Sequence, residues 1–484
     1  MSTAKEAKWP LIVNLSNSII GVSVLTYSFC LKECGILLGA LLLLTSNVVT
    51  RITCHLLMKG ANMVRRGSYE QYALHVFGPA GKTLIEVLTT LFLLSTLCAF
   101  FVVIGDLGPH IVVEFLSLPS VTAQMRVAVM VAIAGSVVLP LSLLRNIESL
   151  NHVSSSAILF YAVFVVRMGL ASLPNLLSMH WTEQVNWWRP GGVLPCLPIF
   201  ALSLSCQTQL FVTAQCMEDA SPMKMDAVVS GAVNLCSTVY FCVGFFGYVA
   251  FYDQIITGDI LVLLASSYWT LLLKLGFLLS VAVSFPLMLF PCRAAIYTML
   301  FKQTPAAHDL TVEVIPERPF KLITVILLMS NLVIAILIPN VELVLGLTGS
   351  VIGSTVCLIL PCVMFLRTAP ETQFYGRIAA QVCLSVGLFI LVVCTFAILH
   401  SHPTTHELPV KQDLITKKPE NETYAATLAQ PQKRHVDSKI EGGTSKAATR
   451  ENGVGQRREP ALPVQPNKKV FLGLLYQLLD ASLL

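Results

Sequence analysis

Polar residues interrupt two of the long apolar stretches in this 484-residue sequence. The first interruption is Ser16-Asn17-Ser18-Ile19-Ile20-Gly21-Val22-Ser23-Val24-Leu25. At the depth of a membrane core, irregular backbone persists only where it lines a cavity or is buried in protein. A helix broken there frees carbonyl oxygens for a cation and points a new helix N-terminus at an anionic group. The residue types in this segment therefore predict a binding site rather than a plain membrane anchor.

Close helix packing through small residues is the alternative explanation of this segment, because membrane interfaces favour Gly and Ser. Asn17 favours the binding site, since a buried amide needs hydrogen-bonding partners. The expected ligands of a small hard cation are Ser16, Asn17 and Ile19. The backbone N–H groups expected to meet an anionic group are those of Gly21, Val22, Ser23 and Val24.

The second interruption, Ser203-Leu204-Ser205-Cys206-Gln207-Thr208-Gln209, follows Pro195 and Pro198. We expect Ser203, Ser205 and Gln207 to line the same site. Farther along, Ser284 precedes Pro286 by two residues, at a place where backbone carbonyls lose helical partners. Its hydroxyl is a further candidate cation ligand, because small hard cations take oxygen ligands. A serine that bonds back to its own helix is an equally good explanation of Ser284.

The elements that must position these residues are membrane helices. Only 12% of the residues are charged and 55% are hydrophobic, which excludes a soluble enzyme, a nucleic-acid binder and a secreted disulfide scaffold. Eleven runs are long and apolar enough to cross a bilayer as helices. They cover residues 9–30, 36–58, 82–104, 127–143, 153–173, 194–213, 227–251, 269–290, 320–338, 341–366 and 374–399. The two interruptions fall in the first and sixth runs, which indicates an inverted repeat of five plus five helices.

Enzymatic chemistry finds no support in the sequence. It contains no Gly-rich phosphate loop, HExxH or GxSxG motif. The fourteen cysteines are scattered, mostly inside apolar runs, without a spacing typical of zinc sites. We therefore expect no catalytic residues and no cofactor, and the only metal we expect is a coupling cation.

The loops that would share a side with the N-terminus hold most of the Lys and Arg residues between the runs. The positive-inside rule then predicts a cytosolic N-terminus. We expect a short N-terminal segment at residues 1–8, a membrane domain at residues 9–399 and a polar tail at residues 400–484. The tail composition predicts disorder, and such a tail could bind a protein partner.

The motifs also resemble a known family. Asn17-Ser18-Ile19-Ile20-Gly21-Val22-Ser23-Val24-Leu25, followed by Cys34-Gly35, is similar to the first-helix signature of the sodium-coupled neutral amino acid transporters. These belong to the amino acid/auxin permease group. Pro140-Leu141-Ser142-Leu143-Leu144-Arg145-Asn146 resembles that family's marker at the end of the fourth helix. The likeness extends over about residues 8–400.

The resemblance implies an all-α membrane protein with a LeuT-like fold of eleven helices, in which the eleventh is peripheral. It implies symport of neutral amino acids (the glutamine, glutamate or alanine class) with sodium, by alternating access. In the family, an asparagine of the first-helix motif and a hydroxyl of the eighth helix contribute to the sodium site. Asn17 matches the first of these directly, and Ser284 is the best match for the second.

This sequence departs from the family pattern in several places. Gln207 stands where many members have histidine, and residues 211–217 also differ. These changes keep two alternatives open: a membrane amino acid sensor without sustained flux, and a proton-coupled permease. The plasma membrane and the endoplasmic reticulum–Golgi system are both compatible with the predicted topology.

Overall fold

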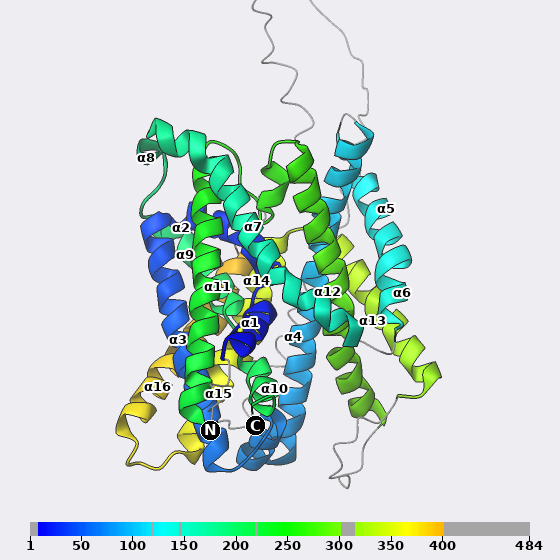
Figure 1. The fold of residues 1–484 in the computed structure, drawn as a ribbon. Helices are drawn as coiled ribbons and strands as arrows, with labels where there is room; N and C mark the ends of the chain where they lie inside the picture. The colour runs from blue at the N-terminus through cyan, green and yellow to red at the C-terminus, as the bar shows by residue number, and fades with distance from the viewer. Residues whose placement is uncertain (1–7, 118–119, 145–147, 218–220, 302–314, 401–484) are drawn as a thin grey trace, which may run out of the picture. The chain divides into compact units, whose positions relative to one another are not determined.

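The computed structural model describes residues 8–117, 120–144, 148–217, 221–301 and 315–400, with side chains described from residue 159 onward in the fifth span. The chain divides into two units, residues 1–404 and 405–484. The second unit lies outside the described residues, and so does the predicted disordered tail. The first unit is a bundle of helices (Figure 1).

The first span is broken where the polar segment predicts. It consists of α1 (Lys8–Ile19) and α2 (Ser23–Cys34), which are bent by 67° relative to each other. Residues 20–22 between them are not helical. The side chains of Val24, Leu25 and Tyr27 on α2 are fully buried. The break therefore lies inside the protein, where irregular backbone can be satisfied by neighbouring helices.

The sixth span is broken as well. The helix α9 (Val193–Ser203) ends at the first residue of the predicted interruption. A short 3₁₀ turn, η3 (Gln207–Gln209), and the helix α10 (Leu210–Gln215) complete the span. The two breaks lie five spans apart, which agrees with the LeuT-like arrangement that the resemblance implies.

The other elements follow the predicted runs in order. Those of the first half are α3 (Ile36–Met63), α4 (Tyr69–Leu116), α5 (Ala123–Ile133), η1 (Ala134–Val138), α6 (Leu139–Ser142), α7 (Glu148–Ser178), α8 (Trp181–Gln184) and η2 (Pro190–Gly192). Those of the second half are α11 (Pro222–Ala250), η4 (Ile260–Leu263), α12 (Tyr268–Phe301), α13 (Glu317–Leu337), α14 (Val341–Leu347), η5 (Thr348–Ile359), α15 (Leu360–Thr368), α16 (Phe374–Phe389), η6 (Ile390–Cys394) and α17 (Thr395–His400).

The all-helical class and the span number are confirmed. Ten helices in the described residues are long and apolar enough to cross a membrane, and the bent pair α1–α2 makes the eleventh. The last span packs on α15, α3 and η5 and leaves an apolar face exposed. This position agrees with the expected peripheral helix. A π-helix, η5, in the tenth span was not predicted, because hydropathy does not distinguish helix types.

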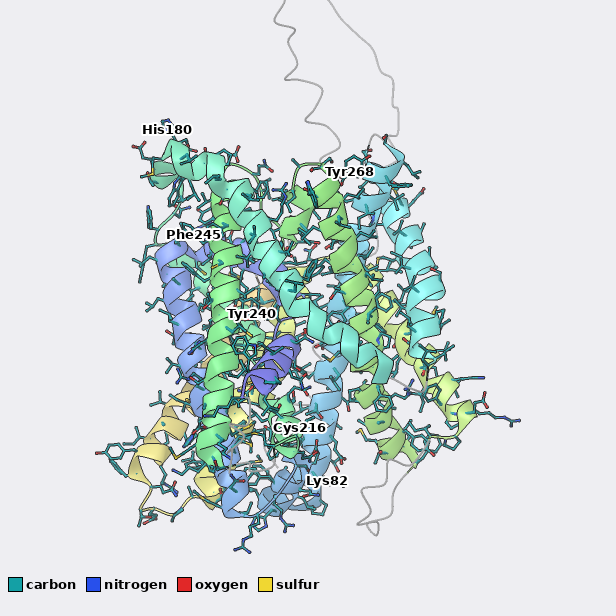
Figure 2. All side chains as sticks on the ribbon, viewed as in Figure 1. Lys82, His180, Cys216, Tyr240, Phe245 and Tyr268 are labelled. Atoms are coloured by element: carbon teal, nitrogen blue, oxygen red, sulfur yellow. The ribbon has the colours of Figure 1, made fainter. Side chains whose placement is uncertain are left out.

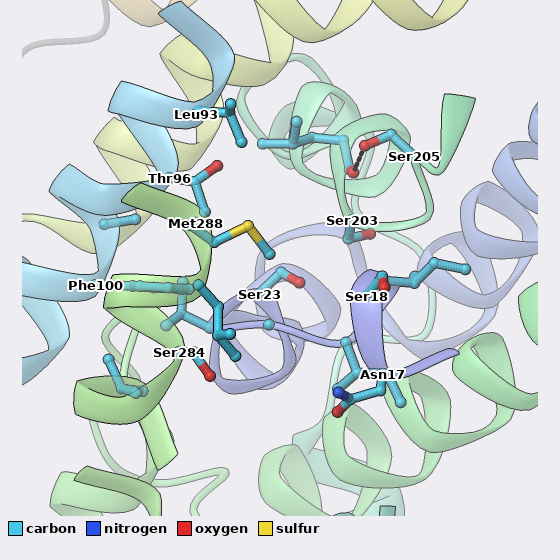
Figure 3. A pocket seen from close by; sticks show the side chains of 18 of the residues that line it. Asn17, Ser18, Ser23, Leu93, Thr96, Phe100, Ser203, Ser205, Ser284 and Met288 are labelled. Atoms are coloured by element: carbon cyan, nitrogen blue, oxygen red, sulfur yellow. Dashed lines mark hydrogen bonds between the residues drawn. The ribbon is translucent and has the colours of Figure 1, made fainter. Parts of the chain in front are cut away.

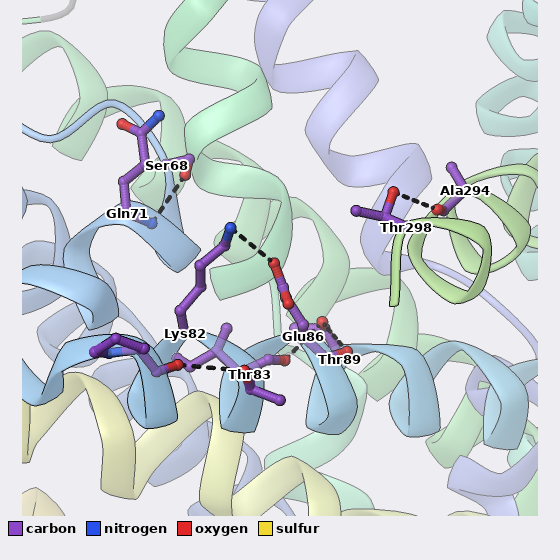
Figure 4. Close-up of polar contacts among 10 residues, drawn as sticks. Ser68, Gln71, Lys82, Thr83, Glu86, Thr89, Ala294 and Thr298 are labelled. Carbon is purple, nitrogen blue, oxygen red and sulfur yellow. Dashed lines mark hydrogen bonds and ion pairs between the residues drawn. The ribbon is translucent and has the colours of Figure 1, made fainter. Parts of the chain in front are cut away.

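The structure adds a helical segment before the third predicted run. The predicted run begins at Lys82, whereas α4 begins at Tyr69, after Ser68 accepts a hydrogen bond from the Gln71 N–H at 3.1 Å. Gly78 interrupts this helix with a φ of 75°, a conformation that glycine adopts easily. The segment before it is too polar for a span, which is why hydropathy missed it. Lys82 pairs with Glu86 at 3.6 Å one turn later (Figure 4).

The two ends of the bundle are named by residues that Figure 2 labels. Lys82 and Cys216 lie at one end, called the Lys82 side below. His180 and Tyr268 lie at the other, called the Tyr268 side. The long helix α11 runs between them and packs against α1, α2, α3 and α7. It is therefore the scaffold against which the broken first span rests.

Candidate functional site

A cavity of about 370 Å³ lies where the two broken spans meet α4 and α12 (Figure 3). Its volume is in the range of small-molecule sites, about 300–1,000 Å³. One wall is formed by Asn14 and residues 17–23, and another by Leu202, Ser203, Ser205, Thr208 and Gln209. In this lining, Asn14 and Ser18 on the first span are exposed, whereas Phe100 and Phe277 are buried.

The described residues that line this cavity include no Asp, Glu, Lys or Arg. Its polar groups are amides and hydroxyls, and its apolar groups include Phe100, Phe277 and Met288. An uncharged lining suits a ligand without net charge, because an ionised ligand side chain would lose hydration without gaining a counter-ion.

Most of the residues predicted from the sequence lie around this cavity. Those in the lining are Asn17, Ile19, Gly21, Val22, Ser23, Ser203, Ser205 and Ser284. Asn17 on α1 and Ser284 on α12 are on opposite walls (Figure 3). Ser205 donates to the Leu202 carbonyl at 2.6 Å, so its hydroxyl partly closes the turn after α9.

Three predicted residues lie outside the lining: Ser16, Val24 and Gln207. Gln207 is buried and donates from Nε2 to the Thr53 hydroxyl on α3 at 2.9 Å. Its Oε1 accepts from the Cys206 N–H at 3.0 Å. Gln207 thus ties the sixth-span break to a neighbouring helix. The hydroxyl of Ser16 is buried and has no hydrogen-bond partner in the part of the chain that the structure describes, so its oxygen is a candidate cation ligand.

Several lining residues were not found from the sequence. Thr96 on α4, Tyr161 on α7, Met288 on α12 and Thr348 at η5 all reach the cavity. The polar pair at residues 95 and 96 inside an apolar run was a usable signal for α4. The others offered none, because an isolated aromatic or Met residue in an apolar run is usually lipid-facing or packing.

Tyrosine hydroxyls hold the carbonyls that the first break releases. Tyr161 donates to the Ile20 carbonyl at 3.0 Å, and Tyr240 donates to the Ile19 carbonyl at 3.1 Å. Both carbonyls stand at the end of α1, where the helix supplies no partner. The tyrosine hydroxyls thus stabilise the break, and each of the two carbonyl oxygens keeps one lone pair for another group.

The sequence family described as "Transmembrane amino acid transporter protein" matches residues 5–401 of this chain. The match covers every described helix. The chain belongs to that family. Its membership agrees with the family resemblance of the motifs in the first and fourth spans.

Two relatives show how far the likeness extends. "Solute carrier family 38 member 10" of Mus musculus is 40% identical over 413 residues, which are 85% of this chain and 37% of that protein. "Sodium-coupled neutral amino acid transporter 4" of Homo sapiens is 23% identical over 78% of this chain and 81% of its own length. The chain therefore spans a little over a third of the first relative. Both names are those of carriers, and neither is the name of an enzyme.

Among solved structures, MhsT in complex with L-phenylalanine covers 79% of this chain and 99% of its own, at 12% identity and a TM-score of 0.46. This overlap is too weak to locate a residue in the transporter-family chain. The candidate site is accordingly defined by the cavity and its hydrogen bonds alone.

On the Tyr268 side, ion pairs hold neighbouring helices together. Arg126 on α5 pairs with Asp106 on α4 at 3.0 Å and also donates to the Pro339 carbonyl at 3.3 Å. Lys274 on α12 pairs with Glu114 on α4 at 3.3 Å. These pairs join α4 to α5 and to α12, and so hold the Tyr268 side of the transporter-family domain closed.

The loop before α12 completes this closure. Thr26 on α2 donates to the Gly258 carbonyl at 3.1 Å, and the next residue, Asp259, is 2% exposed. Its Oδ1 accepts from the Leu261 N–H at 3.0 Å, whereas Oδ2 has no hydrogen-bond partner among the described residues. Burial raises the pKa of Asp259 well above its usual value of 3.8, and the Asp106 carboxylate raises it further. A buried carboxyl of this kind favours its protonated form.

The closed Tyr268 side is expected to weaken as pH rises. Between the ordinary pKa near 3.8 and the raised value, the folded protein binds a proton that the unfolded chain has released. Stability must therefore fall with increasing pH across that window. Asp259→Asn keeps the shape of the side chain and removes the group that titrates. We expect the thermal midpoint of the purified protein to fall less from pH 5 to pH 8 in this variant than in the wild type. Parallel profiles for the two proteins would contradict this role of Asp259.

Proposed function

We propose that this chain moves neutral amino acids across a membrane by sodium-coupled alternating access. The observation that supports the proposal is the cavity itself. It lies at the meeting point of two broken spans and is lined by uncharged polar groups in a chain of the amino acid transporter family. A neutral amino acid is a zwitterion with one ammonium and one carboxylate group. The carbonyl groups at a helix C-terminus can bind the first, and the N–H groups at a helix N-terminus can bind the second.

The amino acid carboxylate is assigned to the start of α2. The helix N-terminus at Ser23 adjoins Gly21 and Val22, and all three line the cavity. Backbone N–H groups and the helix dipole there favour a negative group. Ser203 and Ser205 lie on the facing wall and are assigned to the rest of the substrate.

The sodium ion is assigned to oxygens of α1 and α12. The amide of Asn17, the hydroxyl of Ser284 and carbonyls of residues 16–19 form a set of hard oxygen donors. The unpartnered Ser16 hydroxyl adds a further oxygen nearby. The Ile19 carbonyl already accepts one hydrogen bond, so only its second lone pair is available.

The proposed orientation has the N-terminus in the cytosol, which the distribution of Lys and Arg between the loops supports through the positive-inside rule. On that topology the Lys82 side is cytosolic. The exposed lining residues Asn14 and Ser18 lie on the N-terminal half of the first span, while ion pairs hold the Tyr268 side together. The described arrangement is then an inward-facing state. Transport would require the ion pairs on the Tyr268 side to separate as the Lys82 side closes, which is the alternation that such carriers use.

The deciding experiment is uptake of labelled glutamine and alanine, with labelled glutamate as the charged comparison, into proteoliposomes that hold the purified protein. Accumulation above equilibrium only with a sodium gradient is the expected result. Accumulation that follows a pH gradient without sodium would establish a proton-coupled permease instead. Binding without uptake would establish an amino acid sensor.

Gly21→Ala tests the carboxylate position. A Cβ at Gly21 meets no other atom within 4 Å, so the methyl group has room and the fold should persist. It would occupy the space in which the carboxylate approaches the start of α2. We expect KM for the amino acid to rise on the order of tenfold, which corresponds to ~1.4 kcal/mol, with an unchanged thermal midpoint. An unchanged KM would place the carboxylate elsewhere.

A further inference from the structure

Tyr240 on α11 has an unusual set of partners for a residue that does not line the cavity. It is fully buried at mid-height in the bundle (Figure 2). Its hydroxyl lies 3.1 Å from the Ile19 carbonyl and 3.1 Å from the Ser203 carbonyl. The Ser23 hydroxyl lies 3.1 Å from the same oxygen. One side chain thus joins the first-span break to the sixth-span break.

The two carbonyls have equivalent positions in their helices. Ile19 is the last residue of α1, and Ser203 is the last residue of α9. A carbonyl at a helix C-terminus has no intrahelical donor. A phenol has a single proton to donate, whereas its oxygen can accept. The two carbonyls therefore compete for one proton of Tyr240, and the Ser23 hydroxyl can donate to the Tyr240 oxygen.

The ring of Tyr240 is held in place by its neighbours. It stacks on the ring of Tyr27 with 4.4 Å between centroids, and the Tyr27 hydroxyl bonds to the Ser203 hydroxyl. One turn earlier on α11, the Cys236 thiol lies 3.7 Å from the Ser16 carbonyl. If the Tyr240 hydroxyl moved with the end of one broken helix, its hydrogen bond to the end of the other broken helix would consequently be disturbed.

We propose that Tyr240 is a positioning residue that couples the two broken spans of the transport site. It fixes the position of the end of α1 relative to the end of α9, so that the two breaks move together with α11. Its shared proton links their states: a cation that engages either carbonyl sends the proton to the other. This inference rests on the proposed function for its consequence in transport, but its structural part can be tested without transport.

Amide hydrogen exchange of the purified full-length protein tests the structural part. Tyr240→Phe removes the hydroxyl and keeps the ring. We expect exchange to accelerate about tenfold, the factor that 1.4 kcal/mol represents, in peptides that cover residues 16–25 and residues 202–209. Acceleration at only one break, or at neither, would overturn the coupling.

The matched control is Tyr248→Phe on the same helix. Tyr248 is 2% exposed, and its hydroxyl accepts from the Asn186 N–H at 3.0 Å, away from both breaks. The same substitution there should leave exchange at both breaks unchanged. If Tyr240→Phe does not fold, Ser23→Ala serves instead. It alters the first span, yet we expect it to raise exchange in residues 202–209 through Tyr240, and an effect confined to residues 16–25 would refute the proposal.

Uptake measurements test the consequence for transport. With Tyr240→Phe, KM for the amino acid and the half-saturating sodium concentration should both rise, on the order of tenfold. Tyr248→Phe should change neither. A purely structural role would lower only the amount of folded protein and leave both constants unchanged, which would overturn the proposal. Absence of uptake in the wild type would count against the proposed function, whereas the exchange result would still decide the role of Tyr240.

Discussion

Asn17→Ala is expected to remove most of the sodium dependence of amino acid uptake. The Asn17 side chain lines the cavity on α1, in the segment that bends by 67° into α2. An amide oxygen that ligates a cation is a strong, charge-assisted contact, worth about 1.5–3 kcal/mol when it is lost. The half-saturating sodium concentration should therefore rise on the order of tenfold to a hundredfold. Ser284→Ala, on the opposite wall, should act in the same direction.

Uptake as a function of external sodium measures this effect, at matched amounts of protein in the vesicles. Ser280→Ala is the control, because Ser280 also lines the cavity on α12, one turn before Ser284. Its half-saturating sodium concentration should stay close to that of the wild type. If both Asn17→Ala and Ser284→Ala retain wild-type sodium dependence, the assigned ion site is wrong.

Loss of Glu114 is expected to cause the largest fall in stability. Its carboxylate pairs with the ammonium group of Lys274 at 3.3 Å, and the side chains of Lys274 and Glu114 are only 4% and 13% exposed. Lys274 has one more contact, at 3.5 Å to the Leu264 carbonyl. Glu114→Ala would leave the ammonium group buried without its counter-ion. Removing one partner of a buried pair costs about 3–5 kcal/mol, so the thermal midpoint should fall by several degrees.

A double variant separates the ion pair from simple packing. Apolar residues of similar volume often replace a buried pair at little cost. Glu114→Leu combined with Lys274→Met should therefore recover most of the stability that the single substitution loses. Additive losses in the double variant would mean that the pair does not hold α4 against α12 on the Tyr268 side.

The positions of the helices could be predicted from the sequence because a membrane helix satisfies its own backbone hydrogen bonds. A run of residues that is long and apolar enough to span a bilayer therefore predicts a span independently of the other spans. The breaks were visible for a related reason. Asn17 and Gly21 in the first span, and Ser203 to Gln209 in the sixth, are out of place in a continuous apolar helix. The helical segment before Lys82 was not predicted, because its residues are polar and it ends at the conformation of Gly78.

Only the tertiary structure decided which side chains surround the site. Gln207 belongs to the polar segment of the sixth span, yet it turns to Thr53 instead of the cavity. Met288 and Tyr161 come from apolar runs and still reach the cavity. Hydropathy records that a helix is apolar, but it does not record which face turns toward the protein. That choice depends on neighbours far away in the sequence.

The contacts that connect the two breaks have the same origin. Tyr240 lies 221 residues from Ile19 and 37 from Ser203, and its hydroxyl joins them only because α11 packs between the two spans. Likewise, Asp259 is an ordinary loop carboxylate in the sequence and becomes a buried one when the loop folds over the Tyr268 side. The spans and their breaks could be predicted from the sequence, because hydropathy and the backbone bonding of a helix depend on neighbouring residues along the chain. The tertiary structure decided how the breaks are held, because a hydrogen bond between distant segments exists only after they pack together.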